Sequence, residues 1–479
     1  MPTLFHQRGS TRIILLLFVL VALLVALPRL WLNQSDQPFS PSDSPDRVAV
    51  SPRSDGTLPP DVRSSRRALV ARAPDLPSSQ LAQTLRAVHQ LIEQGNDAEA
   101  ERQLAMLPQD AHSDPQARRA TSVLWNNLGV IRGKRDGAEA AIPAFETAIS
   151  LAPDDRISRL NLTHAYWERK DPRLTREFLE RTLELANDEA LPHLALADLL
   201  YDRDDLAGAS FHLEQATSLA AGNPDLQAYL QVVTAKVNRA EQVEQRFSSR
   251  KSAHFMVKYD GHEDRQIWHE VLSILEEAYR EIGQRFEYFP PEPITVVLHT
   301  KATFPAATGS PFWVDGLYDR ILGRIQIPTQ GALTDRAWLT RVLRHEFVHA
   351  LLHQRMEGQI NGLPTWLNEG LAMQLAGDHW PDLDQVIQGE ITVVPLSSLE
   401  GSWMPLPANA AVVAYLEGNS ATGYLIDRYG MQKVREIIGQ LAIGKPIAVA
   451  IKDRLFISYE EFQRRWVQNL NEKLQSKTI

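Results

Sequence analysis

Four stretches with different patterns of apolar and polar positions follow one another along the chain. Residues 13–27 form a continuous apolar run, whereas residues 33–79 contain few apolar residues and many Ser, Pro and Asp. From about residue 80 to residue 245, apolar residues recur at helical spacing, and beyond residue 246 short alternating segments precede further helical ones. The pattern predicts several folding units rather than one.

The apolar run near the N-terminus has the length of a membrane-spanning helix. Fully helical, residues 13–32 would extend over about 30 Å, the thickness of a bilayer core. Basic residues precede the run, which predicts a cytoplasmic N-terminus and export of the remainder. A cleaved signal peptide would look similar, but no small-x-small cleavage site closes the run. We therefore expect a membrane anchor over residues 1–32, a flexible linker over residues 33–79, and periplasmic or extracytoplasmic domains after them.

The helical stretch over residues 80–245 repeats with a period of 34. Leu128, Leu162 and Leu196 form one series with this spacing. Two further series are Phe145, Leu179 and Leu213, and Ala148, Thr182 and Ala216. The best-matched unit, from Trp125 to Pro153, resembles a tetratricopeptide repeat, in which two antiparallel helices pack closely through small residues. The resemblance implies an all-α solenoid that binds a protein or peptide; a structural spacer and an irregular helical bundle stay open as alternatives.

Strand patterns precede helical patterns in the C-terminal stretch. Residues 254–259 alternate, residues 293–298 read as a buried strand, and residues 323–328 alternate again. A proline stops the last alternation, which is typical of an edge strand. An extended peptide could pair with such an edge through its backbone. Strands first and helices after indicate an α+β domain over residues 246–479.

Composition narrows the chemistry that this chain can perform. Its 479 residues include 59 acidic and 50 basic ones, for a formal net charge of −9, which argues against a nucleic-acid partner. The absence of cysteine excludes disulfides, a cysteine nucleophile and a thiolate metal site. Fourteen histidines remain, so a transition-metal site has to combine His with Asp or Glu.

One segment, His345-Glu346-Phe347-Val348-His349, combines two potential metal ligands with a carboxylate. Residues four apart lie on one face of a helix, so His345 and His349 can both face one metal ion. Imidazole suits zinc, and Glu346 can accept a proton from a metal-bound water. An amphipathic helix whose histidines are ordinary core or surface residues is the alternative interpretation of this motif alone.

A second carboxylate makes the metal interpretation more specific. Glu369 follows His349 by twenty residues, in a segment that starts near Pro364 and reads as a helix. If that helix returns antiparallel, it brings Glu369 to the same metal. Two histidines and a glutamate with a fourth position left open are the layout of a catalytic zinc site.

The two segments together resemble the gluzincin metallopeptidases, and most closely the bacterial peptidase MA-like domains. The resemblance rests on His-Glu-x-x-His followed by Trp366-Leu367-Asn368-Glu369-Gly370. It implies that His345, His349 and Glu369 bind Zn²⁺ and that Glu346 is the general base. A metzincin site is excluded, because Leu352 and Arg355 stand where that pattern has glycine and histidine.

Further residues are candidates for supporting roles. Peptide hydrolysis needs a donor for the developing oxyanion, and Tyr415 is the first candidate. Tyr424 and Tyr318 are the alternatives. Asn368 is a candidate to orient the site, and Asp378 is a weaker one. His353 and His379 are expected to be surface residues.

The sequence thus predicts a multidomain chain: an all-α tetratricopeptide-repeat solenoid, an α+β gluzincin-like metallopeptidase domain, and one N-terminal transmembrane helix. Its expected function is that of a membrane-anchored zinc metallopeptidase acting on polypeptides, with a repeat arm for a protein partner and no nucleic acid. The alternative is a protein-interaction scaffold whose peptidase-like domain is inactive or structural.

Overall fold

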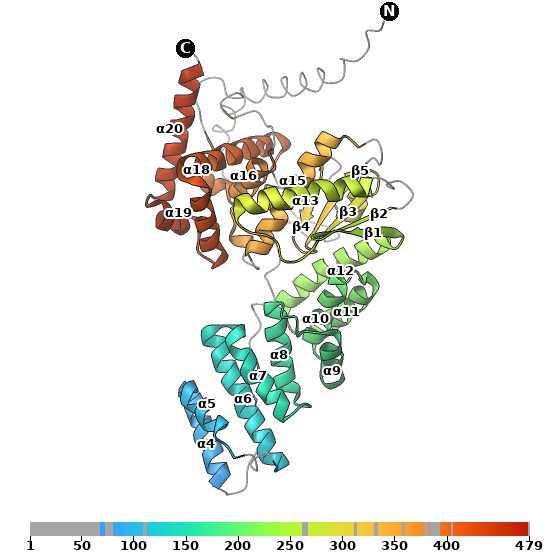
Figure 1. Ribbon diagram of the computed structural model, residues 1–479, viewed down its shortest axis with the longest axis vertical. Coiled ribbons are helices and arrows are strands. Elements are labelled where there is room, and N and C mark those ends of the chain that lie inside the picture. The colour runs from blue at the N-terminus through green and yellow to red at the C-terminus, as the bar shows by residue number, and fades with distance from the viewer. Residues whose placement is uncertain are drawn as a thin grey trace, which may run out of the picture. The chain divides into compact units, whose positions relative to one another are not determined.

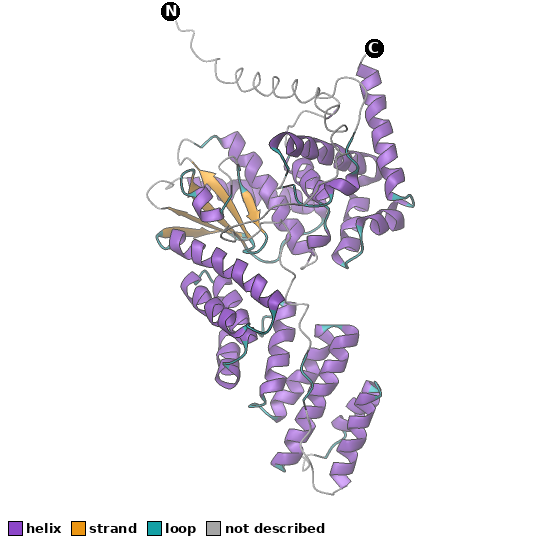
Figure 2. Cartoon of the chain, turned by 180° about the vertical axis from the view of Figure 1, so that it is seen from behind, coloured by secondary structure: helices purple, strands orange, loops and turns teal. Residues whose placement is uncertain are grey.

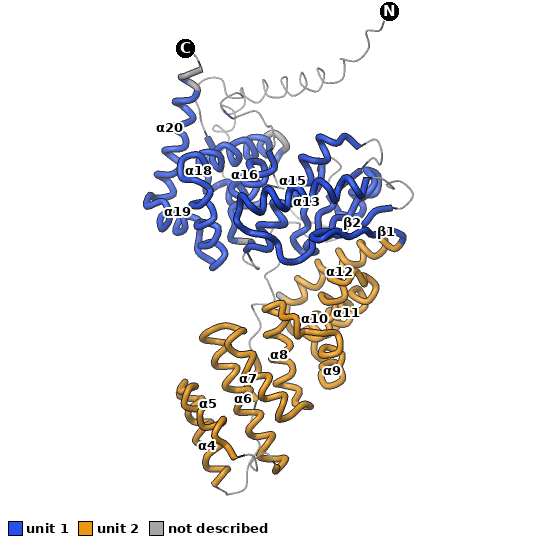
Figure 3. The backbone as a smooth tube through the Cα atoms, in the orientation of Figure 1, with its two compact units in different colours: residues 1–58, 246–479 blue, residues 59–245 orange. Residues whose placement is uncertain are grey.

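The computed structural model describes most of the chain after residue 80, together with one short segment before it (Figure 1). The described residues are 68–71, 80–108, 113–260, 267–310, 314–329, 334–356, 360–377, 383, 393–403 and 406–477. They fall into two compact units, each described below by itself (Figure 3). One unit comprises residues 59–245, and the described residues of the other lie within 246–479.

The unit of residues 59–245 is built from helices that pack in consecutive pairs. These helices are α4 (Gln80–Glu93), α5 (Asp97–Ala105), α6 (Pro115–Asp136), α7 (Ala138–Leu151), α8 (Arg156–Arg169), α9 (Arg176–Ala186), α10 (Ala190–Asp202), α11 (Leu206–Leu219) and α12 (Pro224–Glu244). Asp and Asn side chains accept backbone hydrogen bonds at the N-termini of α6, α8, α11 and α12, which satisfies donors that have no partner within the helix.

The residues of the 34-residue series occupy buried positions in these helix pairs. Leu128, Leu162 and Leu196 lie in α6, α8 and α10 and are each at most 2 % exposed. Gly129, the residue after Leu128 in α6, allows α7 to approach α6 closely, because a Cβ atom there would come within 2.6 Å of the Phe145 ring of α7. The spacing therefore marks the residues that pack successive helices together. The identification of these pairs as tetratricopeptide repeats stays a prediction.

The second unit contains a five-stranded sheet of order β1-β2-β3-β5-β4. The strands are β1 (Phe247–Lys251), β2 (Phe255–Asp260), β3 (Ile294–Thr300), β4 (Leu317–Asp319) and β5 (Arg324–Thr329). β2, β3 and β5 are parallel to one another, and β1 and β4 are antiparallel to their neighbours. The parallel pair β2 and β3 needs a crossover, which the amphipathic helix α13 (Ile267–Phe286) provides.

Most of the remaining α-helices of this unit join the sheet in one hydrophobic core. They are the short α14 (Phe304–Thr308), α15 (Arg336–Met356), α16 (Thr365–Ala376), α18 (Ala408–Ala442), α19 (Ile447–Leu455) and α20 (Tyr459–Lys477). α15 packs against α13, β4 and β5 and also against α16. α18 bends at Gly430, whose φ of 81° lies outside the helical region. α15 and α16 thus connect the sheet to the C-terminal helices.

The predicted fold class needs correction. Within the described residues the protein is mostly helical with one small sheet (Figure 2). A bilayer-spanning helix needs about 20 mostly apolar residues, and no described helix is long and apolar enough. The long helices α13, α15 and α20 carry charged residues along their length, as expected for helices with a solvated face.

The predicted transmembrane helix, and the single-pass membrane localisation inferred from it, are therefore not supported and are not retained. Residues 1–32, for which the anchor was predicted, lie outside the described residues. Of the predicted linker, residues 33–79, only residues 68–71 are described.

The predicted edge strand over residues 323–328 is an interior strand. β5 lies between β3 and β4, and the three-residue strand β4 forms the edge instead. Every residue of β5 is buried, including Arg324 at 2 % and Gln326 at 4 % exposure. The Gln326 side chain pairs with His299 Nε2 at 3.0 Å. Buried polar residues therefore produce the same alternation that a solvated face would.

Candidate metal centre and active site

α15 presents the predicted metal ligands on a helix whose other residues are held in the core. Leu343, Phe347 and Leu351 on this helix are fully buried. At its middle, the Arg344 guanidinium donates to the Ala376 carbonyl of α16 at 3.1 Å and pairs with Glu281 of α13 at 2.8 Å. These contacts set the position of α15 relative to α16, where the third predicted ligand lies.

α16 carries Glu369 and crosses α18 very closely at the next residue. A Cβ atom on Gly370 would lie 2.5 Å from the Gly418 carbonyl oxygen and would overlap the Thr422 side chain. On the same helix, Trp366 is fully buried and donates its indole N–H to the Tyr459 hydroxyl at 2.9 Å. The glycine after Glu369 thus allows the approach of the two helices that holds this carboxylate in place.

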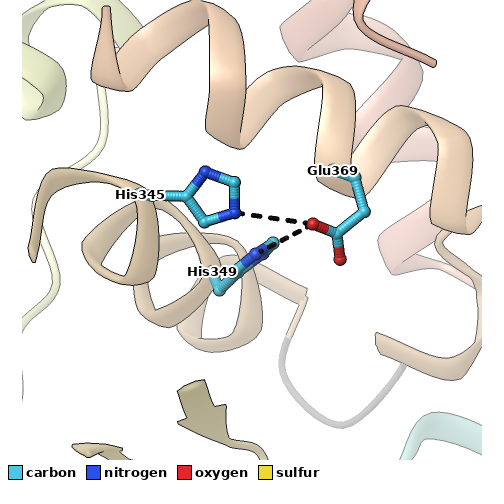
Figure 4. Close-up of side chains that lie close together, drawn as sticks. All are labelled: His345, His349 and Glu369. Atoms are coloured by element: carbon cyan, nitrogen blue, oxygen red, sulfur yellow. Dashed lines mark ion pairs between the residues drawn. The ribbon is translucent and has the colours of Figure 1, made fainter. Parts of the chain in front are cut away.

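The three predicted ligands come together in the structure (Figure 4). One donor atom from each of His345, His349 and Glu369 lies within 4.8 Å of the others. Glu369 Oε2 is 3.5 Å from His345 Nε2 and 3.4 Å from His349 Nε2. In the described part of the chain, this is the one group of three or more His, Asp or Glu side chains with such geometry.

The two histidines stabilise the negative charge of Glu369. Burial by itself would raise the pKa of the Glu369 carboxyl, but the charge of His349 and hydrogen bonds from both histidines outweigh that effect and hold the pKa below its usual range. The two histidines therefore favour the ionised form of Glu369. A buried anionic oxygen beside two imidazole nitrogens is a suitable donor set for a divalent cation.

Asn368 orients one of the two histidines. Its Oδ1 lies 3.1 Å from His349 Nδ1, and the side chain is only 5 % exposed. With Nδ1 bonded to Asn368, Nε2, the atom that faces Glu369, is the nitrogen of His349 that is left to bind a metal. Asn368, a candidate from the sequence, is thus placed to orient the His349 ring.

Glu346 lies close to the same three side chains, whose charges all act on its carboxyl. Its side chain is 7 % exposed, and burial raises the pKa of its carboxyl, while the charges of His349 and His345 act in the opposite direction. The backbone of Tyr318, in the edge strand β4, lies near enough to this carboxyl to lower its pKa, as the last of these contributions. Sequence reasoning missed this proximity, because a backbone group leaves no signal in residue identity.

Tyr415 reaches the site from α18. The negative charge of Glu369, followed by burial and the charge of Glu346, raises the pKa of its hydroxyl well above the usual value. The ring is half-buried and packs edge-to-face on Trp403, with centroids 5.0 Å apart. Among the candidate tyrosines, Tyr415 is therefore the one whose hydroxyl responds to both glutamates.

The other candidates lie elsewhere or outside the described residues. The Tyr318 hydroxyl pairs with His353 Nδ1 at 2.7 Å, and neither residue belongs to the ligand group. Tyr424 packs against Tyr429 and Phe462. Asp378 and His379 are not among the described residues.

We expect Gly370→Ala to destabilise the protein by about 1–3 kcal/mol, since the added methyl group overpacks the α16–α18 crossing. Urea unfolding would measure the change. Gly439→Ala in α18 is the matched control, because a Cβ atom at Gly439 would meet no other atom within 4 Å, and there alanine should stabilise the helix by up to about 1 kcal/mol. Equal effects of the two substitutions would contradict the close-approach role of Gly370.

Comparison with known protein families places this site within a recognised domain. Residues 318–472 match the model of the Peptidase MA superfamily. This range includes β4, α15, α16 and the Tyr415 region of α18. The match supports a peptidase MA-like domain and, with it, peptidase activity. A search of curated proteins finds no match.

Proposed function

We propose that this protein is a zinc-dependent metallopeptidase of the gluzincin type, which hydrolyses peptide bonds in polypeptide substrates. The observation that carries the proposal is the convergence of His345, His349 and Glu369, with their donor atoms within 4.8 Å of one another. The peptidase MA-like match over residues 318–472 supports it independently.

The donor set fits zinc. Two imidazole nitrogens and one carboxylate oxygen are ligands that zinc accepts, and three protein ligands leave a position for the reactants. When bound, the ion would act as a Lewis acid that stabilises negative charge developing on the substrate. Asn368 contributes by fixing the His349 ring so that Nε2 faces the centre.

Glu346 acts as the general base in this proposal. Its carboxylate takes a proton from the attacking water and passes it to the leaving amine. Burial raises its pKa, which brings the group closer to the range in which it can both accept and release a proton.

Tyr415 and β4 have supporting roles in the same reaction. The Tyr415 hydroxyl stays protonated, because its pKa is raised, and so it can donate a hydrogen bond to the oxyanion. β4 is the last strand of the described sheet, and the backbone of its Tyr318 lies near Glu346. An extended substrate that pairs with the outer edge of β4 would therefore pass beside the general base.

The test is the zinc content of the purified full-length chain after exposure to excess Zn²⁺ and removal of unbound metal. We expect about one zinc ion per chain in the parent and a clear loss in Glu369→Ala, which removes one of three ligands. His353→Ala is the matched control, because His353 lies one turn further along α15 and pairs with Tyr318.

Two results would contradict the proposal. A folded, zinc-supplied parent that holds no zinc would exclude the metallopeptidase and favour a protein-interaction scaffold. Zinc retained fully in Glu369→Ala, or lost equally in His353→Ala, would show that the ligand set is a different one. Cleavage of unfolded casein by the zinc-loaded chain then tests the activity itself.

A further inference from the structure

A short segment before the first described helix is held by side chains far along the chain. Residues 68–71 contact α6 and α8, all within the unit of residues 59–245. The Leu69 N–H donates to Asn161 Oδ1 at 2.8 Å, and Asn161 Nδ2 donates to the Leu69 carbonyl at 2.8 Å. One asparagine side chain thus satisfies both backbone groups of one residue.

The same arrangement recurs two residues further along the segment. The Ala71 N–H donates to Asn127 Oδ1 at 2.9 Å, and Asn127 Nδ2 donates to the Ala71 carbonyl at 2.8 Å. Asn126 joins the pair, because it donates to the Leu69 carbonyl at 3.2 Å and accepts from Asn161 at 2.8 Å. Asn126, Asn127 and Asn161 form what is called the asparagine clamp below.

The clamp follows the repeat of the helix pairs. Asn127 and Asn161 are 34 residues apart, each directly before a leucine of the repeated series. They hydrogen-bond the backbone of residues 69 and 71, which are alternate positions and so lie on one side of an extended chain. The corresponding position in α10 is Ala195, so the asparagine clamp does not extend to the next helix pair. The clamp is thus a property of two successive helix pairs.

The asparagine side chains of the clamp are buried, which favours a ligand that pairs with both the donor and the acceptor of each amide. Asn126, Asn127 and Asn161 are at most 4 % exposed. A buried amide without hydrogen-bond partners costs about 1–3 kcal/mol, so when residues 69–71 leave, water or another donor–acceptor pair has to replace them. The paired N–H and C=O of an extended peptide residue supply that pair, whatever its side chain.

The side chains of the segment show which residues such a peptide can carry. Val70 is 64 % exposed and Leu69 is 37 % exposed, whereas Ala71 is 4 % exposed. Among residues 69–71, the buried position of Ala71 is therefore the one that excludes a large side chain. The site is suited to an extended segment with one small residue, recognised through its backbone.

We propose that the asparagine clamp is a binding site for an extended polypeptide segment, and that residues 69–71 occupy it intramolecularly. An unfolded polypeptide then binds only when this resident segment is displaced. The inference rests on the protein-interaction role predicted for the helix pairs, and it specifies the ligand of that role as an extended polypeptide backbone. Peptide binding at the clamp needs neither zinc nor catalysis and is measured without either. The peptide-binding proposal and the metallopeptidase proposal can therefore be refuted separately.

The experiment uses the full chain and a labelled neutral peptide, Gly-Ser-Ala-Leu-Val-Ala-Ser-Gly, which carries residues 68–71 without the neighbouring arginines. Ala71→Arg places a large charged side chain at a buried position and releases the resident segment. We expect this variant to bind the peptide at least about 10-fold more tightly than the parent, in which a tethered competitor acts at an effective concentration of about 1 mM. Fluorescence anisotropy measures both affinities.

Two controls test the backbone recognition itself. A peptide N-methylated at its leucine and at its second alanine keeps every side chain but lacks the two donors, and we expect it not to bind. Asn161→Ala in the Ala71→Arg chain should likewise lose most of the binding. A folded Ala71→Arg chain that fails to bind the parent peptide, or binds the N-methylated peptide equally well, overturns the proposal.

A measurement on the unmodified chain covers the case in which Ala71→Arg does not fold. The amide protons of Leu69 and Ala71 should be protected from hydrogen exchange, since both are donated to asparagine side chains. Millimolar unmethylated peptide should lower that protection, and the N-methylated peptide should not. Protection that no peptide changes would show that residues 68–71 are a permanent structural tie.

Discussion

Glu346→Gln is expected to lower the turnover of an unfolded casein substrate by about 10²–10⁴-fold, the usual contribution of a general base. Glutamine has nearly the same shape as glutamate, so it should fit the same buried position. It cannot accept a proton from the attacking water at neutral pH. The loss should therefore appear in kcat, while the zinc content of the chain stays unchanged.

The control for this substitution is Glu436→Gln, which neutralises a carboxylate that pairs with Lys433 on α18. We expect it to leave both zinc content and kcat at the parental level. Full activity of zinc-loaded Glu346→Gln would remove Glu346 from the mechanism. Loss of zinc together with activity would instead assign it to the ligand set, which the distances of His345, His349 and Glu369 do not suggest.

Tyr415→Phe is expected to lower kcat by about 10²–10³-fold, as for removal of one oxyanion donor, with a smaller effect on KM. The phenylalanine ring can keep the edge-to-face contact with Trp403, so folding should be preserved. Only the hydroxyl, whose proton is retained because of the nearby glutamate charges, is lost. Steady-state kinetics with casein-derived peptides would separate kcat from KM.

Tyr424→Phe is the matched control, because Tyr424 lies on the same helix but packs against Tyr429 and Phe462. It should leave kcat unchanged. If Tyr415→Phe had no effect on kcat while Tyr318→Phe reduced it, the oxyanion donor would be on β4 rather than on α18. That result would also require the Tyr318 hydroxyl to leave His353, its present partner.

Some features of this protein followed from the sequence because they depend on local spacing. Ligands four residues apart on a helix share a face whatever surrounds the helix, so His345 and His349 could be paired from the sequence. The 34-residue series also identified residues that are buried in the structure, such as Leu128 and Leu162, because packing between successive helix pairs repeats with the chain.

Other features required the tertiary structure, because they depend on neighbours distant in sequence. The alternation in β5 resembles an edge strand, yet its polar residues Arg324 and Gln326 are buried, and only the pairing with β4 reveals an interior strand. The predicted transmembrane helix is not supported, because no described helix is long and apolar enough to cross a membrane.

By itself, the sequence determined which residues could form a metal site: a helical His-Glu-x-x-His motif and a glutamate twenty residues further on. The tertiary structure decided how close these donors lie and which groups support them. The Tyr318 backbone near Glu346 and the backbone of Leu69 and Ala71 in the asparagine clamp are main-chain groups common to nearly all residues. No side-chain pattern specifies their partners, because backbone hydrogen bonds depend on where the chain passes in space.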